Sequence, residues 1–78
     1  MIIKSQNGET FVNSKMIVSY EMRKVSLFKY EVYASDESLR DYLLAVYSTQ
    51  KDALKALSDL TYAISNDEKT SIFMMQTE

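Results

Sequence analysis

The chain lacks two residue types on which many active sites and metal centres depend: its 78 residues include no cysteine and no histidine. Without cysteine there can be no disulfide, thiolate metal site or cysteine nucleophile. Without histidine the commonest general base and metal ligand is missing. Serine beside lysine remains, in Lys4-Ser5 and Ser14-Lys15, but neighbouring side chains of a strand point to opposite faces. We therefore expect no enzyme and no cofactor.

Proline is absent and Gly8 is the single glycine. Phosphate-binding loops need several glycines, and a calcium loop needs a central one, so the sequence argues against both sites. Nine basic and eleven acidic residues give a net charge of −2, and they are mixed along the chain, which argues against a concentrated basic face. The acidic pairs Asp36-Glu37 and Asp67-Glu68 are interpreted as solvated turn charges rather than as a cation site.

Long apolar runs are also missing. Residues 1–6 are too short and too polar for a signal peptide, and no run approaches the length of a membrane span. With no cysteine either, we expect a cytoplasmic protein without a membrane partner. Apolar residues nevertheless make up 46% of the chain, which indicates a folded chain rather than a disordered one. Its length predicts a single domain over residues 1–78.

The strongest local signal is the pair Asn7-Gly8 between two apolar segments. This pair favours a β-hairpin with a type I′ turn, because both residues tolerate positive φ. We expect strands over residues 1–6 and 9–14. Ile3 would then lie opposite Val12 on the core face, and Phe11 would lie beside Lys4 on the other face.

Alternation of apolar and polar residues predicts further antiparallel strands. Residues 16–24 and 27–34 each place one apolar set on one face, with a turn near residues 24–26. After a polar turn at 35–38, residues 39–47 are apolar on both faces, which is typical of a strand covered on both sides. The core-facing sets expected in the first two strands are Met16, Val18, Tyr20 and Met22, and Phe28, Tyr30, Val32 and Ala34.

Residues 50–65 have helical periodicity. Thr49 is the expected N-cap, accepting from the amide of Asp52, with Ser48 as a competing cap, and Asn66 is a suitable left-handed stop. A solvated turn at 67–69 and a short strand at 70–76 would follow. The fold class is therefore α+β: an antiparallel β-meander of four to five strands packed by one amphipathic helix, with a short C-terminal strand. The predicted apolar stripe of the helix is Ala53, Ala56, Leu57, Leu60, Ala63 and Ile64.

The C-terminal segment suggests a contact surface. It is a short apolar strand at an expected sheet edge, where a second chain can pair, and methionine adapts to varied partners. The alternative is that the segment completes the core of its own chain. We predict a self-associating protein-interaction module, a homodimer or small oligomer with a further protein partner, that uses Ile72, Phe73, Met74 and Met75 together with Tyr42 and Tyr33.

A second hypothesis is binding of single-stranded nucleic acid. Strand tyrosines can stack on bases, and nearby basic residues can contact phosphates. Tyrosine is also favoured in strands for packing alone, so nucleic acid is the alternative partner rather than the expected one. The residues concerned are Tyr20, Tyr30 or Tyr33 with Arg23, Lys24 and Lys29.

Two segments, MIIKSQNGETFVN and VYSTQKDALKALSDL, resemble small uncharacterised proteins of Gram-positive bacteria, their phages and their mobile elements. The resemblance covers residues 2–12 and 46–60 and the order of elements between them. It implies the same hairpin, meander and helix, and a phage or mobile-element context, but no activity. The chain departs from this pattern after Ala34, where it lacks the glycine that such proteins often carry before the next strand.

Overall fold

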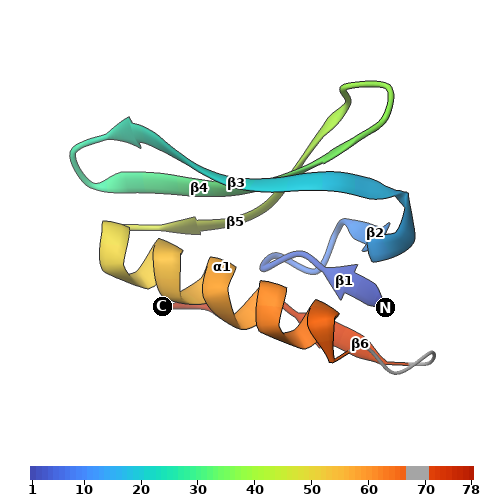
Figure 1. Cartoon of the computed structure of the whole chain (residues 1–78). Coiled ribbons are helices and arrows are strands. Elements are labelled where there is room, and N and C mark those ends of the chain that lie inside the picture. Colours follow the sequence, from blue (N-terminus) through green and yellow to red (C-terminus); the bar gives the residue numbers. More distant parts are fainter. Residues whose placement is uncertain (67–70) are drawn as a thin grey trace.

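The computed structural model describes residues 1–66 and 71–78. It confirms the α+β class, and its strands are divided between two three-stranded sheets (Figure 1). Sheet A has the order β2-β1-β6, and sheet B has the order β3-β4-β5. The turn predicted at 67–69 lies outside the described residues. The elements are β1 (Ile2–Lys4), β2 (Phe11–Asn13), the 3-10 helix η1 (Ser14–Met16), β3 (Ile17–Ser26), β4 (Lys29–Asp36), β5 (Asp41–Tyr47), α1 (Gln50–Ser65) and β6 (Ile72–Met74).

The N-terminal hairpin has the predicted register, with Ile3 opposite Val12. The predicted turn type is wrong. A type I′ turn needs positive φ at two successive residues, and here Gly8 has a φ of 78° while Asn7 does not share that conformation. The turn closes one residue earlier, through a 2.9 Å hydrogen bond from the Gly8 amide to the Ser5 carbonyl. The Asn7 side chain accepts from the Ser5 hydroxyl and from the Glu9 amide, at 2.7 and 3.0 Å, and so holds this shape.

Strand β6 lies at the edge of sheet A, as predicted, and runs parallel to β1. The Ile2 amide donates to the Ser71 carbonyl at 3.1 Å, and the Met75 amide donates to the Lys4 carbonyl at 3.0 Å. A parallel neighbour requires a long crossover connection, and the crossover here includes sheet B and α1. The two chain ends therefore form one sheet (Figure 1).

A β-bulge changes the predicted face of β3. Ile17 pairs with Asp36 and Ser19 with Ser35, so Val18 is an extra residue in the strand. An extra residue reverses the alternation on one side of the bulge. Ile17 consequently packs against the core, and Met16 and Val18 are exposed. Both had been predicted to face the core.

The connection between β3 and β4 also differs from its prediction. Ser26 pairs with Lys29, so the turn consists of Leu27 and Phe28 rather than residues 24–26. Val25 is an extra residue just before this turn. Phe28 therefore lies at a hairpin tip, 75% exposed, instead of in the core.

A bulge in β5 explains why this strand is apolar on both faces. Tyr33 pairs with Leu43 and Val32 with Ala45, which leaves Leu44 as the extra residue, and Leu44 and Ala45 are both buried. The strand lies at an edge of sheet B, where Gln6 partly covers it. The Gln6 amide donates to the Leu44 carbonyl at 2.7 Å, and the Gln6 side chain accepts from the Val46 amide at 3.0 Å.

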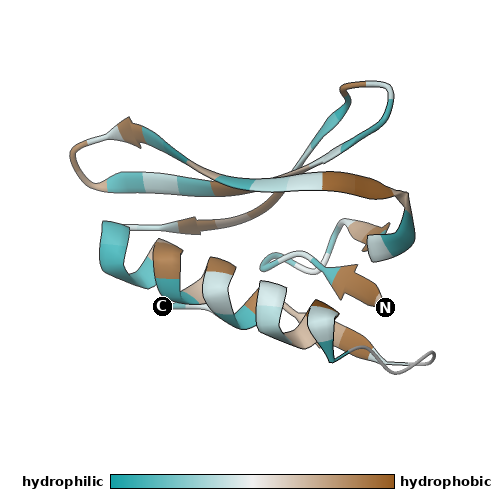
Figure 2. Ribbon diagram, in the orientation of Figure 1, coloured by the Kyte–Doolittle hydropathy of each residue, from teal (hydrophilic) through white to brown (hydrophobic). Residues whose placement is uncertain are grey.

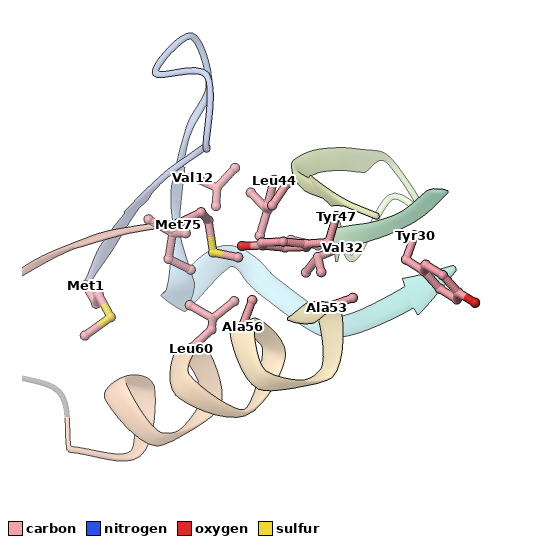
Figure 3. Close-up of a cluster of buried hydrophobic side chains, with 13 residues drawn as sticks. Met1, Val12, Tyr30, Val32, Leu44, Tyr47, Ala53, Ala56, Leu60 and Met75 are labelled. Atoms are coloured by element: carbon pink, nitrogen blue, oxygen red, sulfur yellow. The ribbon is translucent and has the colours of Figure 1, made fainter. Parts of the chain in front are cut away.

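Helix α1 spans the predicted residues and packs on sheet B (Figure 1). Its N-cap is Thr49, whose hydroxyl accepts from the Asp52 amide at 3.2 Å. Asn66 ends the helix without the predicted left-handed conformation: its φ is −110°, and its backbone and side-chain amides both donate to the Tyr62 carbonyl. The helix, both sheets and the chain ends enclose one core (Figure 3) that includes Met1, Val12, Val32, Leu44, Tyr47, Ala53, Ala56, Leu60 and Met75.

Candidate protein-interaction surfaces

The outer face of sheet A consists of the side chains of sheet A that point away from the core. Ile3, Val12 and Phe73 point inward, so their neighbours along each strand point outward. The register places these outward residues in two cross-strand rows, Phe11–Lys4–Met74 and Asn13–Ile2–Ile72. Phe11, Ile72 and Met74 are each about three-fifths exposed. Figure 2 shows the apolar character of β1 and β6 that this face shares.

The predicted interface residues of the C-terminal strand are divided between two faces. Ile72 is 64% exposed and Met74 is 59% exposed. Phe73 is partly buried against the core, and Met75 is 3% exposed within it. Both interpretations of this segment therefore apply to alternate residues: Phe73 and Met75 complete the core, and Ile72 and Met74 are available for contact.

The two tyrosines predicted to join this surface lie elsewhere, on opposite faces of sheet B. Tyr42 is partly buried against the core, and its hydroxyl donates to the Asp36 carboxylate at 2.9 Å. Tyr33 lies on the outer face, where its hydroxyl donates to the Glu31 carboxylate at 3.1 Å. The structure thus does not bring Tyr33 and Tyr42 together with Ile72.

The outer face of sheet B carries a charged cluster around Arg23. Its guanidinium binds the carboxylate of Glu21 and, at 3.0 Å, that of Asp41, and it lies 4.3 Å from the centre of the Tyr33 ring. These two hydrogen bonds raise the pKa of Arg23 above its ordinary value. A 2.6 Å hydrogen bond from Ser35 and the contact with Arg23 lower the pKa of Asp41. Arg23 is therefore already engaged by carboxylates of its own chain.

The residues of the nucleic-acid alternative do not form one surface. Tyr30 is buried in the core. Tyr20 packs against the core, and its buried hydroxyl has no hydrogen-bond partner among residues 1–66 and 71–78; burial raises the pKa of this phenol. Arg23 lies on the opposite face, while Lys24 and Lys29 are exposed near the hairpin end. With Tyr20 and Tyr30 directed inward, Tyr33 is the tyrosine of this hypothesis that lies beside a basic residue, and the Arg23 guanidinium already packs against its ring.

The β4–β5 turn presents an exposed leucine in an unfavourable backbone conformation. Leu39 has a φ of 64° and is 85% exposed. The Asp36 carboxylate organises the turn by accepting from the amides of Ser38 and Arg40, at 2.9 and 3.0 Å. The Arg40 amide, followed by the Tyr42 hydroxyl, lowers the pKa of Asp36. Leu39 thus occupies the position where related turns favour glycine.

Exposed apolar side chains also gather at the two ends of β3. At its start are Met16 and Val18, and at its end are Val25 and the hairpin tip of Leu27 and Phe28; each is more than half exposed. Figure 2 shows the apolar segment at the start of the strand. The alternation of residues along the sequence does not indicate their exposure, because it carries no sign of the two bulges in β3.

Two hollows adjoin the outer face of sheet A: one beside Met74 has a volume of about 510 Å³, and the one beside Phe11 is small. It has a volume of about 130 Å³ and lies between Phe11, Met16 and Tyr42, well below the roughly 300–1,000 Å³ typical of small-molecule sites. Within the described residues, no group of three or more acidic side chains could hold a metal ion. The described part of the chain also contains no helix with the length and apolar character to cross a bilayer.

Comparison with protein-family models, curated proteins and solved structures yields no match for this chain.

Proposed function

We propose that this chain is a non-enzymatic protein-interaction module that associates with itself. The observation that carries the proposal is the number of large apolar side chains in contact with solvent, which is at least twelve among the described residues. Single exposed apolar residues are common on protein surfaces, but contiguous groups mark contact sites. Here eight of the twelve gather in two places, three on the outer face of sheet A and five at the two ends of β3.

The size of the chain supports the same proposal. A domain of 78 residues has a small core, and domains of this size often gain stability by association. Removing one such side chain from water stabilises a complex by about 1.5–3 kcal/mol when its burial is complete. Five or six of these residues buried together would offset the entropic cost of association, which is of the order of 4–15 kcal/mol.

The predicted contact strand supplies the first candidate surface. Ile72 and Met74 belong to β6, the edge strand of sheet A, and each lies in one of the two cross-strand rows on the outer face of that sheet. The resemblance to small proteins of Gram-positive bacteria, phages and mobile elements belongs to this proposal, since it implies a fold and a context without an activity.

Sedimentation equilibrium over a wide range of protein concentration tests the proposal. The expected result is a reversible dimer or small oligomer whose fraction rises with concentration. A protein that stays monomeric up to its solubility limit contradicts self-association.

A further inference from the structure

We propose that a second copy of this chain pairs with the free edge of β3, antiparallel and with a two-fold axis beside Met22. The two copies of sheet B would then form one continuous sheet. This inference rests on the proposed self-association and identifies the surface that carries it.

Strand β3 is the longest strand of the described chain, and β4 is its only strand neighbour there. The strand order places β3 at an edge of sheet B, and Figure 1 shows α1 below this sheet. Its unpaired backbone groups are an open template for a further strand.

Hydrogen bonding in the sheet identifies which residues direct their backbone groups to this edge. The Asp36 amide donates to the Arg40 carbonyl, on the β5 side of β4. Backbone groups of successive residues point to opposite edges of an antiparallel strand, so Ser35, Tyr33 and Glu31 point toward β3. The partners of Tyr33 and Glu31 there are Glu21 and Arg23. The residues between and beside these two, namely Tyr20, Met22 and Lys24, therefore direct their amides and carbonyls to the free edge.

The two bulges of β3 limit where a second strand can pair. Extra residues at Val18 and Val25 interrupt the regular ladder, which leaves Ser19 to Lys24 between them. A symmetric antiparallel pair can place its two-fold axis beside an edge-facing residue (Tyr20, Met22 or Lys24) or beside an intervening residue such as Glu21 or Arg23. An axis at Glu21, Arg23 or Lys24 sets two like charges opposite each other. An axis at Tyr20 sets the extra residue Val18 opposite Met22 of the other copy. An axis at Met22 avoids both problems.

The Met22 axis also pairs opposite charges. It sets Glu21 of each copy opposite Arg23 of the other, as a pair whose Cβ atoms lie about 4.5–5.5 Å apart. Both side chains lie on the outer face and are partly exposed, at 49% and 39%. Because Glu21 and Arg23 also contact each other within one copy, the dimer would hold a square of alternating charges. Arg23 keeps its contact with Asp41 in this arrangement.

The apolar ends of β3 match under the same symmetry. Met16 and Val18 precede Met22 by six and four residues, and Val25, Leu27 and Phe28 follow it by three, five and six. The two-fold axis therefore brings the start of each β3 beside the hairpin tip of the other copy. It accounts for five of the exposed apolar residues, none of which belongs to the outer face of sheet A.

A charge-complementation experiment on the full chain tests the proposal. Glu21→Arg sets arginine opposite arginine in the homodimer, and Arg23→Glu sets glutamate opposite glutamate. Replacing two favourable pairs by two repulsive ones is expected to raise the dissociation constant about tenfold or more in either variant. Mixing the two variants restores opposite charges at both pairs, so a heterodimer is expected to form at concentrations where each variant alone is monomeric.

Matched controls distinguish the β3 edge from the outer face of sheet A. Glu9→Arg makes the same charge change in the β1–β2 loop and is expected to leave the dissociation constant unchanged, as is Ile72→Lys on sheet A. Far-UV circular dichroism establishes that each variant is folded, and Glu21→Arg keeps the Arg23–Asp41 contact should Arg23→Glu unfold. If the wild type dimerises but Ile72→Lys alone disrupts the dimer, the β3 register is refuted and self-association stands. A strictly monomeric wild type refutes both.

Discussion

Replacing Leu39 by glycine is expected to stabilise the protein. Leu39 has a φ of 64° and is 85% exposed, so its side chain contributes little burial while its Cβ is crowded. A left-handed conformation costs an L-residue about 1–2 kcal/mol, and glycine avoids that cost. Glycine also adds about 0.5–1 kcal/mol of unfolded-state entropy, so the middle of both ranges leaves a net gain of about 0.75 kcal/mol. For a domain of this size, that gain raises the melting temperature by about 3–6 °C.

Thermal unfolding followed by far-UV circular dichroism measures this effect, with all variants at one protein concentration because association changes the melting temperature. The control is Leu39→Ala, which removes the exposed side chain but keeps the Cβ. It is expected to change the free energy of unfolding by less than about 0.5 kcal/mol. Equal stabilisation by alanine and glycine would show that the backbone conformation is not the cause, and destabilisation by glycine would show that Leu39 is not strained at this position.

Three further predictions concern the packing of the core, two tyrosine hydroxyls and the loss of stability at low pH. Leu60 is fully buried, so Leu60→Ala is expected to cost about 2–5 kcal/mol in urea unfolding; a loss below 1 kcal/mol would contradict the packing of α1 on the core. Tyr20→Phe removes a buried hydroxyl that has no hydrogen-bond partner among the described residues, and it is expected to stabilise the protein by about 1 kcal/mol. Tyr47→Phe removes a hydroxyl that donates to the Gln76 carbonyl at 2.6 Å, and it is expected to destabilise the protein by about 0.5–1.5 kcal/mol. Changes of the opposite sign in urea unfolding would contradict these two roles. The folded state lowers the pKa of Asp36 and Asp41 below 3.8. The stability that these two carboxylates contribute is therefore present above about pH 4 and is lost as the pH falls through the lowered pKa values. In urea unfolding between pH 5 and 2, Asp41→Asn should lose less stability with falling pH than the wild type, and an unchanged pH dependence would contradict this contribution.

The sequence predicts the local features of this fold well because short-range chemistry determines them. The helix follows from the Thr49 cap and an apolar stripe of helical spacing. The facing of Ile3 and Val12 follows from a short loop, closed by a hydrogen bond from the Ser5 amide to the Thr10 carbonyl, whose midpoint lies between Asn7 and Gly8. The turn type could not be predicted, because the same residues are compatible with several turn types and a hydrogen bond between the Ser5 and Asn7 side chains determines which one forms.

The bulges at Val18, Val25 and Leu44 are the main features that the alternation did not predict. A bulge inserts one residue without a compositional signal, and every side chain on one side of it changes face. The alternation in β3 therefore predicted a regular amphipathic strand and did not indicate that its apolar ends are exposed. The division of the candidate interface has a similar origin, because the parallel pairing of β6 with β1 joins the two ends of the chain and no local pattern specifies it.

Amide hydrogen exchange at increasing protein concentration tests the β3 dimer most directly. If two copies pair through β3, the amides of Tyr20, Met22 and Lys24 exchange more slowly as the concentration rises, because each donates to the second copy, while those of Ile72 and Met74 do not change. Rapid exchange at Tyr20, Met22 and Lys24 at concentrations where the protein is dimeric would contradict this pairing.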